Sequence, residues 1–68
     1  MHERRDSMSI GQKLRALRGD KTQREVAQDL QITKSAYAMY EQDKRIPRDE
    51  VKVRIARYFN VSIQSIFF

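Results

Sequence analysis

The sequence predicts an all-α protein, a compact bundle of about five short helices. Apolar residues recur at helical spacing in several short stretches, and a serine or threonine stands before most of them as a helix N-cap. Glycine, asparagine or proline separates these stretches. Strand signals are weak, because the one alternating stretch, Val61 to Ile63, is short and follows a helix end.

The first predicted helix begins after Ser9, a residue type that caps helix N-termini well. Behind it, Ile10, Leu14 and Leu17 stand at positions i, i+4 and i+7, which places them on one helix face. The Gly-Asp pair at 19–20 then ends the helix.

Thr22 caps the second predicted helix, and Glu25 stands three positions later, which makes a capping box. The helix ends near its last apolar residue, and the Gln-Ile pair at 31–32 forms a short turn. Its apolar stripe consists of Val26, Ala27 and Leu30.

Thr33 caps the third predicted helix, which runs to about Glu41. Its apolar face consists of Ala36, Tyr37 and Tyr40, and its other faces carry Lys34, Ser35, Ala38 and Met39. Two short helices joined by a turn of a few residues form the helix-turn-helix geometry. There the second helix enters the DNA major groove, which is about 12 Å wide, so residues 33–41 are the expected recognition helix.

A basic loop, Gln42–Arg48, follows this helix, and Pro47 excludes a helical conformation at Ile46. The whole chain carries a formal net charge of +5. Such a charge favours polyanionic partners, nucleic acid first and an anionic membrane surface second. Many small domains are merely basic, so the charge supports a nucleic-acid function only together with a motif.

The fourth predicted helix opens at Asp49 or Glu50, because acidic residues suit a helix N-terminus. Its buried face consists of Val51, Ile55, Ala56 and Phe59. Asn60 ends the helix as a left-handed cap. Ser62 then caps a last short turn or helix, residues 63–68.

The composition argues against an enzyme and against a bound metal or cofactor. The 68 residues include no cysteine and one histidine, His2, so neither a cysteine-based metal site nor a catalytic Cys-His or Ser-His-Asp set is expected. No apolar run approaches a membrane span and no secretory signal is visible, so a cytoplasmic protein is expected. The length predicts one domain, residues 9–68, after a disordered N-terminal arm, residues 1–8.

The segment Thr22–Glu50, TQREVAQDLQITKSAYAMYEQDKRIPRDE, resembles the Xre, or Cro/lambda-repressor-type, helix-turn-helix regulators. The shared pieces are a Thr-Gln opening, an alanine inside the second helix, a hydrophobic-Thr turn, a Tyr-x-x-Tyr-Glu run and a basic loop with a proline. The tail, Ile55 to Phe67, is similar to the family's last two helices. The resemblance implies a lambda-repressor-like fold and a transcriptional regulator, more often a repressor.

The same resemblance implies roles for individual residues. Contacts to base edges would come from Lys34, Ser35, Ala38 and Met39. Contacts to DNA phosphates would come from Gln23, Thr33, Tyr40, Lys44, Arg45 and Arg48. The alternatives are solvated side chains, a purely capping role for Thr33 and a core position for Tyr40. Met39 stands where family members often carry polar or basic residues, so part of the readout is expected to be apolar.

Two further expectations follow from the resemblance. Arg18 and Glu41 match a structural ion pair of the family. Gln31 stands where the family often has glycine, and a non-glycine residue with positive φ costs about 1 kcal/mol, so the turn is expected to be strained or differently shaped. The connection at 19–21 is shorter than in many members, which leaves the tilt between the first two helices open.

One recognition helix reads only a few base pairs, so a symmetric homodimer on an inverted-repeat operator is expected. The candidate interface consists of Ile63, Ile66, Phe67 and Phe68. Alternatively, some of these side chains close the core against Leu14 and Phe59. The alternative function is a protein-binding module on a helix-turn-helix scaffold, an antitoxin-like or regulator partner without its own operator.

Overall fold

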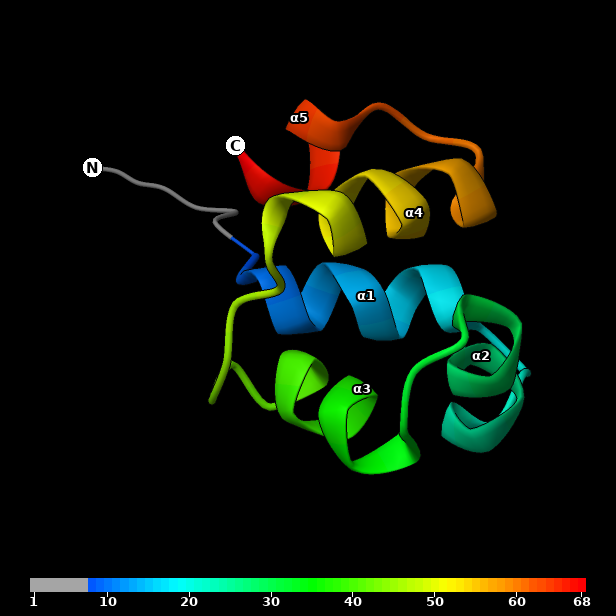
Figure 1. The fold of residues 1–68 in the computed structure, drawn as a ribbon. Coiled ribbons are helices and arrows are strands. Elements are labelled where there is room, and N and C mark those ends of the chain that lie inside the picture. The colour runs from blue at the N-terminus through cyan, green and yellow to red at the C-terminus, as the bar shows by residue number, and fades with distance from the viewer. Residues whose placement is uncertain (1–7) are drawn as a thin grey trace.

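The computed structural model describes residues 8–68, so all of the predicted N-terminal arm except Met8 lies outside the described residues. Five helices follow one another in this part of the chain (Figure 1): α1 (Ile10–Arg18), α2 (Gln23–Leu30), α3 (Lys34–Glu41), α4 (Asp49–Phe59) and α5 (Ile63–Phe67). From residue 8 to residue 68 there is no strand, so the all-α prediction is confirmed.

Helix α1 lies in the middle of the fold, between two groups of helices (Figure 1). Helices α4 and α5 lie on one side of it, and α2 and α3 lie on the other. Both α2 and α1 pack against α3, while α5 packs against α1 and α4. The helix-turn-helix pair therefore forms one side of the bundle, opposite α5 and the chain's C-terminal end, while α2 also packs against α4.

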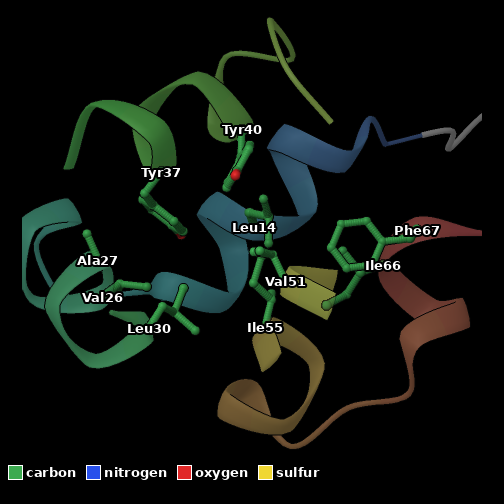
Figure 2. Close-up of a cluster of buried hydrophobic side chains, with 10 residues drawn as sticks. All are labelled: Leu14, Val26, Ala27, Leu30, Tyr37, Tyr40, Val51, Ile55, Ile66 and Phe67. Atoms are coloured by element: carbon green, nitrogen blue, oxygen red, sulfur yellow. The ribbon is translucent and has the colours of Figure 1, made fainter. Parts of the chain in front are cut away.

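The core forms where these helices meet around Leu14 of α1, which is completely buried (Figure 2). All five helices contribute to the core cluster: Leu14, Val26, Ala27, Leu30, Tyr37, Tyr40, Val51, Ile55, Ile66 and Phe67. Phe59, predicted in the buried face of α4, is partly buried and packs against this cluster. Burying apolar surface in this way supplies the main driving force for folding.

The helix N-termini are capped where the sequence predicts it. Thr22 Oγ1 accepts a hydrogen bond from Glu25 N at 3.0 Å, and Glu25 Oε1 accepts one from Thr22 N at 2.8 Å. At α1 the same reciprocal box forms between Ser9 and Gln12, at 3.1 and 2.9 Å. These bonds satisfy backbone donors that a helix N-terminus otherwise leaves without a partner.

The sequence predicts a strained or differently shaped turn between α2 and α3, and the structure has the strained conformation. Gln31 adopts φ 62° and ψ 40°, in the left-handed region. Its backbone N–H reaches the carbonyl oxygens of Ala27 and Gln28 and so ends α2. Asn60 ends α4 in the same conformation, with φ 57°, but asparagine tolerates this region better than glutamine does.

We expect Gln31→Gly to stabilise the protein by about 0.5–1 kcal/mol, because glycine removes the penalty of the left-handed conformation. This gain raises Tm by roughly 2–8 °C in a domain of this size, which a thermal melt measures directly. The matched control is Gln28→Gly, in the exposed interior of α2, which should lower stability by about 1 kcal/mol. A Gln31→Gly variant that melts below the wild type contradicts the account of this turn.

Candidate nucleic-acid interface

Helix α3 has one buried face and one outward face. Tyr37, Tyr40 and Glu41 are 0%, 7% and 3% exposed and hold the helix against the rest of the fold. The outward face consists of Lys34 and Ser35, which are exposed, and Ala38 and Met39, which are half-buried. Because each residue of a helix turns by about 100°, these four residues lie within one arc of roughly 140°. The predicted base-contacting residues thus share one surface.

No carboxylate of α3 is exposed at this outward face, where its charge would repel an anion. The one acidic residue of the helix, Glu41, points into the fold and its side chain is 1% exposed. At the start of the helix the Thr33 Oγ1 atom accepts a hydrogen bond from Ala36 N at 3.0 Å. Thr33 therefore acts as the N-cap of α3, while its exposure leaves the hydroxyl group accessible to an outside donor or acceptor.

Arg18 and Glu41 form a two-pronged ion pair between α1 and α3. Arg18 Nε donates to Glu41 Oε2 at 2.7 Å, and Arg18 Nη2 donates to Oε1 at 3.1 Å. Burial alone would raise the pKa of Glu41, but its hydrogen bonds, that from Arg18 first, outweigh burial and hold this pKa below its usual range. The hydrogen bond to Glu41 likewise raises the pKa of Arg18. The pair fixes the end of α3 on α1.

Gln23, the first residue of α2, is also held by Glu41. Its Nε2 atom donates to Glu41 Oε1 at 3.0 Å. The sequence predicts Gln23 as a phosphate contact but does not predict this bond, since the two residues are eighteen positions apart. The bond orients the amide side chain at the entrance to α2, while the residue as a whole remains partly exposed.

Asp43, two residues after the end of α3, has a structural role that the sequence alone does not indicate. It adopts φ 60°, a strained value for a non-glycine residue. Its carboxylate accepts hydrogen bonds from Ser9 Oγ at 2.7 Å and from Gly11 N at 2.8 Å. These two bonds, that from Ser9 first, lower the pKa of Asp43. The carboxylate thus joins the loop after α3 to the N-terminus of α1.

Gly11 allows this junction to close. A Cβ atom at position 11 would lie 2.7 Å from the carbonyl carbon of Glu41 and 2.9 Å from Asp43 Oδ2. Real Cβ atoms do not approach other heavy atoms so closely. No role for Gly11 follows from the sequence alone, because nothing in the local pattern shows which backbone passes beside it.

The basic loop that follows α3 is held at both ends and exposed in between. Asp43 holds its start, and Pro47 is buried near its end. Lys44 and Arg45 between them are exposed, and the Arg48 side chain is 83% exposed and lies 3.6 Å from Glu50. These three predicted phosphate contacts therefore form an exposed basic edge in the loop between α3 and α4.

Three residues predicted to contact DNA or a second copy of the chain are buried in the core instead: Tyr40, Ile66 and Phe67. Tyr40 lies in the core rather than on the surface (Figure 2). Ile66 and Phe67, predicted at a dimer interface, are 1% and 9% exposed and close the core, as the alternative interpretation had it. Ile63 packs against the core in part, while Phe68 is 79% exposed, with Lys52 Nζ 5.3 Å from its ring centre.

Other site types find no support among residues 8–68. Histidine, cysteine and carboxylate side chains form no group there that could hold a metal ion. None of the helices described is long and apolar enough to cross a membrane.

The family comparison covers most of the chain. The model of the helix-turn-helix family HTH_3 matches residues 12–66, a range that begins within α1 and ends within α5. A search of curated proteins gives no match.

Proposed function

Because this chain belongs to the HTH_3 helix-turn-helix family, a family of DNA-binding regulators, we propose that it regulates transcription by reading double-stranded DNA with α3. The match confirms the resemblance to the Xre and lambda-repressor-type regulators that the segment Thr22–Glu50 suggests. The observation that carries the proposal is the outward face of α3, which is polar and basic at its start and carries no exposed carboxylate. Such a helix fits the major groove.

Direct readout falls to the four residues of this face. Lys34 can donate to guanine O6 and N7, and Ser35 can donate to or accept from several bases. Ala38 and Met39 offer apolar groups that suit a thymine methyl. The readout is therefore a mixture of hydrogen bonds and apolar contact.

Phosphate contacts from the flanking groups set the register of α3 in the groove. Lys44, Arg45 and Arg48 form the basic edge on one side, and Thr33 and Gln23 stand at the starts of α3 and α2. Such contacts supply much of the affinity and little sequence information. Of the predicted phosphate contacts, Tyr40 has the least structural support, because its ring packs in the core.

We propose a symmetric homodimer that binds an inverted repeat, with a repressor role that rests on the family resemblance alone. Phe68 and the exposed part of Ile63 offer the apolar surface for a second copy, and Ile66 and Phe67 support it from the core. A phenylalanine ring that is 79% exposed is the kind of apolar surface that partners cover.

The test compares Lys34→Ala with Arg45→Ala on the duplex that the wild type binds best. Lys34→Ala should weaken binding there by about 1–3 kcal/mol, which is roughly 5–150-fold, and relax the preference at one base pair. Arg45→Ala should weaken binding to every duplex and lower the salt slope by about 0.9. Equal losses for both variants on all sequences would contradict the assignment of readout to Lys34.

A further inference from the structure

We propose that Arg15 of α1 is an additional phosphate-binding residue and that it shares one DNA phosphate with Gln23 of α2. The two side chains, with the buried Glu41 behind them, would form a small anion site where α1, α2 and α3 meet. This inference rests on the proposed function, since the anion it would take is a phosphate of the DNA backbone.

The side chains of Gln23 and Arg15 both approach one oxygen atom, Oε1 of Glu41. Gln23 Nε2 lies 3.0 Å from Glu41 Oε1, and Arg15 Nε lies 3.9 Å from the same oxygen. Because both nitrogens approach the same oxygen, the two side chains lie close to each other where α1, α2 and α3 meet. We therefore place the proposed phosphate between the exposed part of Gln23 and the guanidinium group of Arg15.

Glu41 does not need Arg15 as its partner. Arg18 already donates to both of its carboxylate oxygens, at 2.7 and 3.1 Å, and is itself largely buried, with 20% of its side chain exposed. One positive charge thus balances the buried carboxylate, and Arg15 is a second cation beside it. The longer 3.9 Å separation and the absence of a hydrogen bond between Arg15 and Glu41 among the described residues fit a loosely held side chain.

Arg15 is accessible to a ligand, since its side chain is 64% exposed while that of Glu41 is 1% exposed. A guanidinium group matches phosphate oxygens through paired N–H donors, and an amide group can add another donor. Asp43, a second carboxylate on which the charge of Arg15 acts, already accepts hydrogen bonds from Ser9 and Gly11. The exposed donors of Arg15 and Gln23 are therefore those best placed to meet an outside anion.

The experiment is a double-mutant cycle on binding to a short duplex of random sequence, since a phosphate contact does not depend on the bases. The variants are Arg15→Ala, Gln23→Ala and the double variant, with Arg57→Ala on the exposed surface of α4 as the matched control. Circular dichroism melts of each variant check that the fold is kept. Affinity is measured over a range of salt concentrations.

We expect Arg15→Ala to weaken binding by about 3- to 10-fold and to lower the salt slope by about 0.9, the value for one phosphate contact. Gln23→Ala should weaken binding without changing the slope, because it removes no charge. The double variant should lose less than the product of the two single losses, since both donors serve one phosphate.

If Arg15→Ala behaves like Arg57→Ala while the wild type binds with a steep salt dependence, the inference is wrong and the proposed function stands. Additive losses would also overturn the shared site, because independent contacts show no coupling. A wild type without salt-dependent binding to any duplex would overturn the proposed function and this inference together.

Discussion

Arg18→Ala is expected to remove a large part of the free energy of unfolding at 25 °C. The substitution removes the partner of a carboxylate whose side chain is 1% exposed, and breaking a buried ion pair in this way costs about 3–5 kcal/mol. Arg18 retains 20% exposure, so the lower end of that range applies. A domain of this length is stable by only about 3–10 kcal/mol. Urea titration followed by circular dichroism measures the loss.

Two controls separate the ion pair from general damage to α1. Arg15→Ala lies one turn earlier, removes a more exposed arginine and should change stability by less than about 1 kcal/mol. The double variant Arg18→Met/Glu41→Leu removes both charges at once and should recover most of the stability, because no buried charge remains without a partner. An Arg18→Ala variant within about 1 kcal/mol of the wild type would contradict the structural role of this pair.

Gly11→Ala is the second change with a large expected effect. The new Cβ atom would meet the backbone of Glu41, which cannot move aside as a flexible side chain could. We expect a loss of about 3 kcal/mol, at the upper end of the usual cost of overpacking. The loop that begins at Asp43 should lose its attachment to α1 at the same time.

Whether Gly11→Ala lowers or raises the free energy of unfolding distinguishes crowding at this position from the gain in helix propensity. In an open helix position, glycine to alanine gains about 1 kcal/mol from helix propensity. The reverse change at an exposed position of the same helix, Ala16→Gly, should therefore cost about 1 kcal/mol without any crowding. A Gly11→Ala variant that is more stable than the wild type would show that α1 does not approach α3 as the structure has it.

The features that the sequence predicts well are those that depend on residues three or four positions apart. The box of Thr22 and Glu25 and the cap at Thr33 are formed by neighbours along the chain. The left-handed caps at Gln31 and Asn60 depend on where an apolar stripe ends and on a single residue's conformation. Periodicity likewise separates the outward residues of α3 from the buried tyrosines, because both faces lie on one short helix.

The features that the sequence does not predict join residues far apart. Gly11 and Asp43 meet although 32 positions separate them, and Gln23 reaches Glu41 over 18 positions. Only the packing of α3 on α1 and α2 brings these groups together. The C-terminal run is a related case, since five residues of α5 cannot show by pattern alone that Phe67 turns inward while Phe68 stays exposed.

Selection from a random duplex library, with purified protein at near-physiological salt, tests whether the outward face of α3 reads DNA sequence. We expect recovery of an inverted repeat whose half-sites lie about one helical turn apart, because two copies would each place one α3 in the major groove. The variant Lys34→Ala should recover the same repeat with a relaxed preference at one position of each half-site. Recovery of no motif, with only weak and salt-sensitive binding, would contradict sequence readout and favour a protein-binding role for this scaffold.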